Sequence, residues 1–283
     1  MKELAGRAAF VTGAGQGIGL GIARALAKAG VNVALADIDA DALKQAAAQI
    51  ETLGVKALAV PADVSDSAAM EAAAARVEAA FGALHILVNN AGVAAAPQPI
   101  SQLKPDEWDW LFAVNVHGVL HGLRFFLPLI RRHGGEGHVV NTASIAGLQV
   151  RPGRGTGGYA TTKYAVVAIS ESLEHELAGS GIGVSVLCPA AVDTSIYDSP
   201  KRRPARFGGP FSPPGAATKA QMIPDGLAPD IVGERVVHAI RSKEFFVFTH
   251  EGPRAWIEER HRRLMEGFDR AGRYNREHGI KTS

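Results

Sequence analysis

The chain has 283 residues, 47% of them hydrophobic, which is enough to bury a large core within one domain. Glycine is frequent (32 residues) and aromatic residues are few (6%), a balance that suits an α/β protein with many tight turns and excludes a disordered or fibrous chain. The formal net charge of +2 is too small to indicate a nucleic-acid partner.

The cellular compartment is inferred from cysteine usage and from the N-terminus. Cys188 is the only cysteine, so an internal disulfide is impossible, which fits a reducing compartment. The N-terminus enters an apolar strand almost at once, without a signal-peptide core, and we find no apolar run long enough to span a bilayer. We therefore expect a cytoplasmic protein with no membrane partner.

Short apolar runs alternate along the chain with longer, Ala-rich stretches of helical character. The predicted strands are 8–11, 32–36, 57–60, 86–88, 138–141, 183–187 and 245–248. The predicted helices are 18–29, 41–53, 67–81 (with Ser65 or Ser67 as N-cap), 107–132, 159–178, 229–241 and 253–277. This alternation predicts βαβ units, and right-handed crossovers then put helices on both faces. The predicted fold class is α/β, a doubly wound parallel sheet in a single domain.

Composition changes at residues 195–227, which are rich in proline and glycine. Five cationic side chains lie there, namely Lys201, Arg202, Arg203, Arg206 and Lys219. A long loop inside a compact domain is typical of a functional lid or of a disordered segment. We expect a substrate lid at 195–228, between a cofactor-binding and catalytic core at 1–194 and a C-terminal helix, strand and terminal helix at 229–283.

A glycine-rich turn follows the first predicted strand. Gly13, Gly17 and Gly19 are spaced G-x-x-x-G-x-G, and Ile18 stands where the commoner dinucleotide pattern has glycine. Glycines let backbone N–H groups approach a pyrophosphate, and the N-terminus of the following helix adds favourable dipole charge. A tight turn without a ligand is the alternative. The position between strand and helix favours a Rossmann-type nucleotide site that includes Gln16.

Asp37 closes the second predicted strand. A carboxylate there can accept hydrogen bonds from ribose hydroxyls and would repel a 2′-phosphate. Positions 14, 16 and 38 carry no lysine or arginine to attract one, so NAD is favoured over NADP. The alternative is a solvated turn aspartate. Asp63 and Val64, after the third strand, are candidates for the adenine edge, although Asp63 alone could equally be a surface cap.

Tyr159 and Lys163 lie four residues apart, and therefore on one face of a helix. A tyrosine titrates near a pKa of about 10, too high for a base at neutral pH, and a nearby ammonium group would lower that pKa. Ser144, after the strand 138–141, could hydrogen-bond the substrate oxygen. The Y-x-x-x-K spacing is weak evidence alone, and its place downstream of the glycine turn makes it strong.

Together these residues resemble the short-chain dehydrogenase/reductase family. The matching segments cover roughly residues 5–195; they are residues 12–19, Asp63 and Val64, residues 89–92, Asn115, Ser144, Tyr159, Lys163 and residues 189–194. The resemblance implies a Rossmann fold, a nicotinamide cofactor, no catalytic metal, and a homodimer or homotetramer.

The resemblance also implies roles for single residues. Tyr159 would be the general acid/base, and Lys163 would lower the pKa of Tyr159 and hold the nicotinamide ribose. Ser144 would orient the substrate carbonyl, and Asn115 would position a water for proton transfer. The residues that would border the cofactor are Asn90, Ala91, Gly92, Pro189, Val192 and Thr194.

The sequence departs from the family pattern in two places. Ser144 and Tyr159 are fifteen residues apart where thirteen is usual, which lengthens the loop 148–158, and Ala190 stands where glycine is usual. The last third of the chain resembles a subgroup that includes dehydrogenases of benzylic alcohols in lignin-type aryl ethers. Bulky aromatic or apolar secondary alcohols, terpenoids and steroids among them, are therefore the expected substrates. The candidate pocket walls are Val93, Ile145, Leu148, Ile196 and Phe211.

Other polar features have less specific interpretations. His117, His121 and His133 have no acidic or cysteine partner nearby in sequence, so we expect no metal site. Cys188 ends an apolar strand and is expected to be a buried small side chain rather than a nucleophile. The arginines of the predicted lid could contact cofactor phosphates or an acidic substrate, or could belong to a solvated loop.

The predicted function is NAD-dependent hydride transfer between a bulky secondary alcohol and its ketone. One alternative is an NADPH-dependent ketoreductase, which Asp37 disfavours. The other is a nucleotide-sensing binding protein without catalysis, which the intact set Asn115, Ser144, Tyr159 and Lys163 disfavours.

Overall fold

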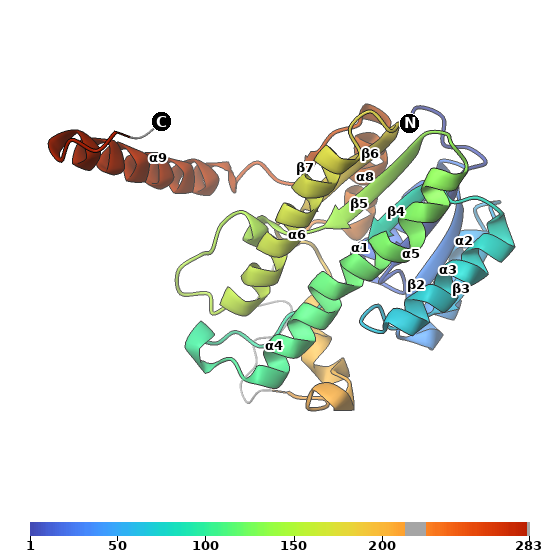
Figure 1. Cartoon of the computed structure of the whole chain (residues 1–283). Coiled ribbons are helices and arrows are strands. Elements are labelled where there is room, and N and C mark those ends of the chain that lie inside the picture. The colour runs from blue at the N-terminus through green and yellow to red at the C-terminus, as the bar shows by residue number, and fades with distance from the viewer. Residues whose placement is uncertain (213–224, 282–283) are drawn as a thin grey trace. The chain divides into compact units, whose positions relative to one another are not determined.

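The computed structural model describes residues 1–212 and 225–281 (Figure 1). By its internal contacts the chain divides into two units, Met1–Thr249 and His250–Ser283. The second unit consists mainly of helix α9 (Arg254–Glu277), none of whose residues is buried. The first unit holds the whole sheet and every candidate site residue.

Seven parallel strands form one sheet in the order β3-β2-β1-β4-β5-β6-β7. Their bounds are β1 (Ala8–Thr12), β2 (Asn32–Asp37), β3 (Ala57–Pro61), β4 (Ile86–Asn89), β5 (Gly137–Thr142), β6 (Ile182–Cys188) and β7 (Phe246–Phe248). The order runs outward in both directions from β1 and β4, so the topological switch point lies between these two strands. Ligands of doubly wound sheets bind beyond the carboxyl ends of the strands at that point.

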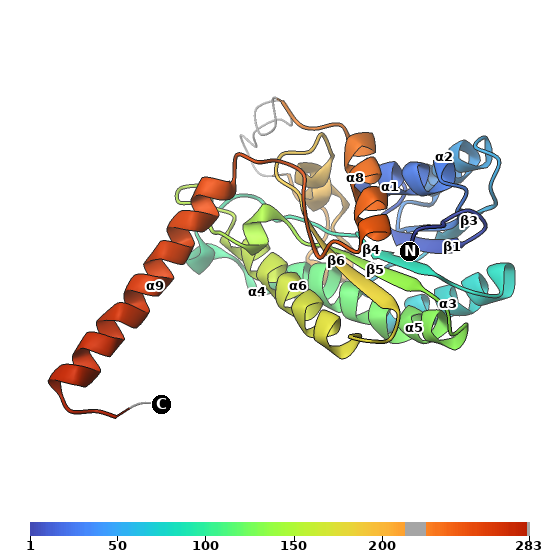
Figure 2. The same ribbon diagram turned by 90° about the horizontal axis from the view of Figure 1, so that it is seen from above.

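Helices cover both faces of the sheet, as predicted (Figure 2). One face packs against α1 (Gly17–Lys28), α2 (Ala40–Glu51) and α8 (Pro229–Ser242). The other packs against α3 (Ser67–Phe81), α5 (Gly118–Arg132) and α6 (Gly157–Glu176). Each layer buries its own apolar cluster, with Ile22 and Leu35 in the first and Phe10 and Phe126 in the second. The α/β fold class is thereby confirmed.

The N-cap of α3 differs from the prediction. Asp66, rather than Ser65 or Ser67, caps the helix, and its Oδ1 accepts hydrogen bonds from the N–H groups of Ala68 (2.9 Å) and Ala69 (3.3 Å). Ser65 instead donates its hydroxyl to Asp63. Serine and aspartate side chains can both accept a hydrogen bond from a free N–H group at a helix start. The sequence therefore located the N-cap only to within one residue.

The long helix predicted at 107–132 is interrupted by a wider turn. Helix α4 (Pro105–Phe112) passes into a π-helical turn, Ala113–His117, and then into α5. A π-turn inserts an extra residue into the helical ladder and is frequent at functional sites. Here it carries the fully buried Asn115.

The same helix corrects one expectation from the sequence. Among the described residues, Pro105–Arg132 is long and apolar enough to cross a membrane by length and composition, although we expected no such run. Half of its most apolar stretch is buried inside the protein. Phe126 and Ile130, both with 0% exposure, pack against the sheet, so the apolar composition serves the core of the fold.

The predicted lid at 195–228 is described only in part. It begins with two 3₁₀ helices, Ile196–Arg202 and Ala205–Phe207. Residues 213–224, and with them Lys219, lie outside the described residues.

A buried histidine stands at the amino end of β5, opposite to the carboxyl ends where the site forms. His138 Nε2 lies 2.8 Å from Ser185 Oγ, and the Ser185 hydroxyl donates to the carbonyl of Glu244 (2.6 Å). Ser185 must therefore accept from a neutral, Nε2-protonated ring. Burial, with the positive N-terminus and Lys243 nearby, lowers the pKa of His138 to about 3.

We expect this histidine to make stability depend on pH. In the unfolded chain a histidine takes up a proton below a pKa of about 6.5, whereas folded His138 does not. Its contribution is therefore complete above pH 6.5 and is lost as the pH falls toward 3, at up to about 1.4 kcal/mol per pH unit. Denaturant unfolding between pH 7.5 and 5 measures this slope.

His138→Gln should reduce the slope, because an amide does not titrate in this range. The control is His175→Gln on the exposed end of α6, which should keep the slope of the wild type. Equal slopes for His138→Gln and the wild type would contradict the assignment.

Candidate active site

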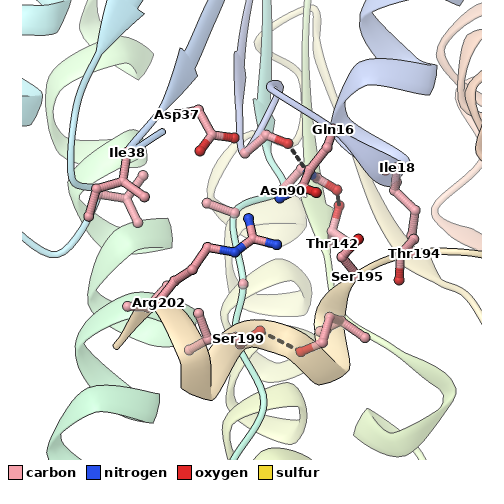
Figure 3. A pocket seen from close by; sticks show the side chains of 18 of the residues that line it. Gln16, Ile18, Asp37, Ile38, Asn90, Thr142, Thr194, Ser195, Ser199 and Arg202 are labelled. Atoms are coloured by element: carbon pink, nitrogen blue, oxygen red, sulfur yellow. Dashed lines mark hydrogen bonds between the residues drawn. The ribbon is translucent and has the colours of Figure 1, made fainter. Parts of the chain in front are cut away.

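An open cleft lies beyond the carboxyl ends of β1 and β4. Together with the solvent at its mouth, the open space of the cleft measures about 1190 Å³. Figure 3 shows its walls, with Gln16 and Ile18 from the start of α1 facing Ser199 and Arg202 from the opposite side.

Most of the residues predicted for cofactor and substrate line this cleft. They are Gly13, Gln16, Gly17, Ile18, Asp37, Asp63, Val64, Asn90, Ala91, Gly92, Val93, Tyr159, Lys163, Pro189, Thr194 and Ile196. These residues come from six segments that are far apart in sequence, and the switch-point topology brings them together.

Four predicted residues support the cleft from behind. Gly19 packs against the glycine turn, and Val192 is buried and pairs with Leu227 in a short parallel bridge. Asn115 and Ser144 are also buried, and each reaches the cleft through its hydrogen-bond partners.

Three of the five predicted pocket walls do not line this cleft. Leu148 packs against a core cluster that includes Val166 and Cys188. Phe211 is 43% exposed and only its backbone is anchored, by an N–H donated to the carbonyl of Pro200 (2.9 Å). Ile145 begins a short 3₁₀ turn behind Ser144.

The glycine turn needs its glycines because it is pressed against its neighbours. Gly13 has φ +63°, and a Cβ there would lie 2.9 Å from the Cα of Ala91. At Gly19 a Cβ would lie 2.1 Å from the carbonyl oxygen of Gly13. The backbone of the turn is therefore open toward the cleft and crowded behind it, the shape that receives a pyrophosphate at a helix N-terminus.

Asp37 lies beside this turn and fixes it. Its Oδ2 accepts a hydrogen bond from the N–H of Gly15 (2.9 Å), and its Oδ1 accepts one from the N–H of Asp39 (3.1 Å). The carboxylate also lines the cleft, so it is more than a solvated turn residue. Each oxygen keeps further acceptor capacity for a ligand hydroxyl.

Asp63 has partners that the sequence did not reveal. Its Oδ1 accepts from the backbone N–H (2.9 Å) and the hydroxyl (2.6 Å) of Ser65, and its Oδ2 pairs with Arg206 (2.5 Å). Burial acts to raise the pKa of Asp63, but these hydrogen bonds and the positive charge of Arg206 outweigh it and hold the pKa below its usual value.

Tyr159 projects into the cleft from the first turn of α6, with Ser144 as a hydrogen-bond partner of its hydroxyl. Desolvation by the surrounding protein raises the pKa of Tyr159 above its usual value, the bond from Ser144 opposes this rise, and Tyr197 adds to it. The lowered pKa expected from the sequence is therefore not produced by the side chains of the protein alone.

Lys163 directs its ammonium to the backbone rather than to the phenol. Its Nζ donates to the carbonyl of Thr142 (2.8 Å) and lies 5.6 Å from the centre of the Tyr159 ring. Burial lowers the pKa of Lys163 to about 8, with Cys188 as a weaker, opposing influence. Since Lys163 lines the cleft, its remaining ammonium hydrogens can serve a ligand hydroxyl there.

Asn115 holds the loop that follows β4. Its Oδ1 accepts from the N–H of Val93 (2.8 Å), and its Nδ2 donates to the Val93 carbonyl (2.9 Å) and to Thr162 Oγ1 (2.9 Å). Both amide hydrogens are thus engaged within the protein. The Asn115 side chain positions Val93 at the cleft, a contribution that the sequence did not predict.

Several cleft residues were missed or left unassigned by the sequence. Thr142 ends β5 and donates to Asn90 Oδ1 (3.3 Å), while Trp110 and Val114 reach the cleft from the interrupted helix. Arg202 also lines the cleft and was noted in the sequence only as one cation of a basic segment. A signal existed for Thr142, because a polar residue at the carboxyl end of a central strand faces the site.

The remaining polar residues form no metal centre within the part of the chain that the structure describes, since no group of three His, Cys, Asp or Glu side chains is placed to hold an ion. His121 instead contacts the carbonyl of Val64 through Nδ1 (2.8 Å). Cys188 is buried, and desolvation raises the pKa of its thiol to about 12, which suits a packing role.

Comparison with known proteins agrees with this geometry. The family profile for short chain dehydrogenases matches residues 7–204. The chain is 30% identical to a CLA biosynthesis dehydrogenase/reductase of Lactiplantibacillus plantarum over 275 residues, 94% of this chain and 95% of that protein. It is 29% identical to a C alpha-dehydrogenase of Sphingobium sp. strain SYK-6, over 94% of this chain and 88% of that protein.

A solved structure is similar over nearly the whole chain. It is a short chain dehydrogenase/reductase from Burkholderia phymatum in complex with NAD, with a TM-score of 0.87 and 36% identity, covering 94% of this chain and 97% of that one. The chain therefore belongs to the short-chain dehydrogenase/reductase family and is an oxidoreductase acting on CH–OH groups.

Proposed function

We propose that the protein is an NAD-dependent dehydrogenase that interconverts a bulky, apolar or aromatic secondary alcohol and its ketone. The observation that carries the proposal is the position of Tyr159, near Ser144 and Lys163, in the wall of a cleft that begins at the glycine turn. Acid/base, orienting and cationic groups then surround one point where a carbinol oxygen can sit.

The residues of the cleft suit a nicotinamide dinucleotide, which when bound supplies the hydride acceptor or donor. The open backbone of Gly13 and Gly17 would receive the pyrophosphate, and Asp37 would accept bonds from the adenosine ribose. The carboxylate of Asp37 disfavours a 2′-phosphate by charge repulsion, which supports NAD over NADP. The complex of the Burkholderia phymatum relative with NAD supports the same preference.

Proton transfer falls to Tyr159 in this proposal. In the reducing direction its hydroxyl donates a proton to the carbonyl oxygen, while Ser144 holds that oxygen by a hydrogen bond. In the oxidising direction the phenolate takes the hydroxyl proton of the alcohol. In this proposal the ammonium of Lys163, 5.6 Å from the centre of the Tyr159 ring, helps to stabilise the phenolate.

The substrate end of the cleft is apolar. Val93, Trp110, Val114 and Ile196 line it, and Trp110 and Val114 belong to the helix that the π-turn interrupts. An apolar wall of this size favours a hydrocarbon or aromatic group on the carbinol carbon. The similarity to the C alpha-dehydrogenase of Sphingobium supports an aryl substrate.

The assembly and compartment complete the proposal. We propose a homodimer or homotetramer in the cytoplasm, on the basis of the family. Leu120 on α5 is 43% exposed and belongs to the apolar surface that an association through this helix would cover.

Tyr159→Phe should abolish turnover and spare NADH binding. The substitution removes the transferable proton and leaves the ring in place, so the rate with a panel of secondary alcohols should fall by at least about a thousandfold. NADH absorbance measures the rate, and NADH fluorescence measures binding. An unchanged rate would refute the mechanism, and a wild type that binds NADH without oxidising or reducing any substrate would favour the nucleotide-sensing alternative.

Asp37→Asn should reduce the preference of the protein for NADH over NADPH. We expect the wild type to bind NADH at least about tenfold more tightly than NADPH, because the carboxylate accepts from ribose hydroxyls and repels a phosphate. Asparagine keeps one acceptor oxygen for the turn and removes the charge, so NADH should weaken and NADPH should not. Tighter NADPH binding by the wild type would support the ketoreductase alternative instead.

A further inference from the structure

The segment that follows β6 places one arginine inside the cofactor cleft. Arg202 is the last residue of the 3₁₀ helix Ile196–Arg202, and it lines the cleft together with Ser199 and Ile196. Figure 3 shows its guanidinium projecting from this helix toward Gln16, with Asp37 on the far side of the cleft.

Among the described residues of this segment, the other three cations each have a carboxylate partner. Lys201 pairs with Asp198 (2.5 Å), Arg203 lies 3.8 Å from Asp106, and Arg206 pairs with Asp63 (2.5 Å). Arg202 has no such ion pair within residues 1–212 and 225–281. Its contact there is the side-chain amide of Gln16, whose oxygen accepts from Nη2 at 3.2 Å in the orientation that satisfies both groups.

The backbone that carries Arg202 is held on both sides. Arg203 is 9% exposed and its Nε donates to the carbonyl of Gly209 (2.8 Å), while the buried Pro200 accepts the N–H of Phe211 (2.9 Å). Arg206 joins the same segment to Asp63 at the adenine end of the cleft. Arg202 itself is exposed, and these bonds hold the backbone next to it at the edge of the cleft.

The place that Arg202 faces is the N-terminus of α1. Gln16 is the N-cap residue of that helix and its side chain makes no capping bond to the helix. Free N–H groups and the helix dipole attract an anion to this point, and a guanidinium across from them adds two parallel donors suited to phosphate. The other cation of the cleft, Lys163, is engaged with Thr142 near Tyr159.

We propose that Arg202 binds the pyrophosphate of the dinucleotide from the side opposite the glycine turn, so that the 3₁₀ helix Ile196–Arg202 contributes a charged residue to the cofactor site. This inference rests on the proposed function. A 2′-phosphate would lie on the Asp37 side, where the carboxylate repels it, and for this reason we assign Arg202 to the pyrophosphate.

The test compares Arg202→Gln with Lys201→Gln, which removes a neighbouring charge from the exposed face of the same helix. Binding of NADH, ADP-ribose and adenosine is measured by calorimetry or by displacement of NADH fluorescence. Arg202→Gln should weaken NADH and ADP-ribose equally, by about tenfold, because one charge-assisted bond to phosphate is lost. Adenosine, which has no phosphate, should bind as to the wild type, and Arg202→Lys should restore part of the loss.

Steady-state kinetics give a second readout. Arg202→Gln should raise KM for NAD and leave kcat within about twofold, since Arg202 lies away from Tyr159 and the bond is made in ground and transition states alike. Lys201→Gln should change neither constant.

Four results would overturn the inference. Unchanged NADH binding by Arg202→Gln would exclude a contact with the cofactor, and weakening of NADPH alone would assign Arg202 to a 2′-phosphate. An equal loss for adenosine, or for Lys201→Gln, would indicate a structural or a general charge effect. If the wild type does not bind NADH at all, the proposed NAD-dependent function is wrong. That outcome is distinct from the four results that contradict only the role of Arg202.

Discussion

The cleft depends on hydrogen bonds that join the ends of β1 and β4. Thr12 Oγ1 accepts from the N–H groups of Asn90 (2.9 Å) and Ala91 (3.0 Å), and Asn90 Nδ2 donates to the carbonyl of Thr12 (3.0 Å). These bonds hold β1 and β4 together beyond Val11 and Val88, the last pair of residues in their parallel ladder. The glycine turn and the loop after β4, which form two walls of the cleft, are thereby joined to each other.

The same network continues to the catalytic helix. Thr142 on β5 donates to Asn90 Oδ1 (3.3 Å) and accepts the ammonium of Lys163 at its carbonyl (2.8 Å). One layer below, Asn89 Nδ2 donates to Asn141 Oδ1 (2.9 Å), and Asn141 Nδ2 donates to Ser170 Oγ (3.1 Å). Buried polar chains of this kind are costly when broken and rigid when complete, so they fix the distance between cofactor walls and Lys163.

Sequence patterns predicted the parts of the structure that arise locally. All seven strands were located by their apolar runs, and the glycine turn by the demand for close backbone approach. The π-turn was not predicted, because its Asn115 bonds to Val93 and Thr162, which are 22 and 47 residues away in the sequence. A local sequence pattern does not contain such distant contacts. Arg202 was indistinguishable from its cationic neighbours in the sequence, since only the 3₁₀ geometry decides which of them faces the cleft.

The raised pKa of Tyr159 has a direct structural cause and a consequence. Burial disfavours charge on both members of the pair, so it raises the pKa of the phenol and lowers that of Lys163 to about 8. Without a further positive charge nearby, the phenol keeps its proton at neutral pH and is ready to donate rather than to accept one. A cationic ligand in the cleft shifts this balance toward the phenolate by simple Coulomb attraction.

The lengthened loop 148–158 acts on the same balance from the substrate side. It is fastened to the loop after β4 by the N–H of Gln98, which donates to the carbonyl of Gly155 (2.9 Å). Burial raises the pKa of Tyr197, and Arg154 in this loop opposes the rise without cancelling it; Tyr197 in turn adds to the raised pKa of Tyr159. The loop thus brings a cation near Tyr197, on the short helix that also carries Ile196. Tyr159, Ser144 and Lys163 lie outside the loop, so its charge acts on Tyr159 through Tyr197.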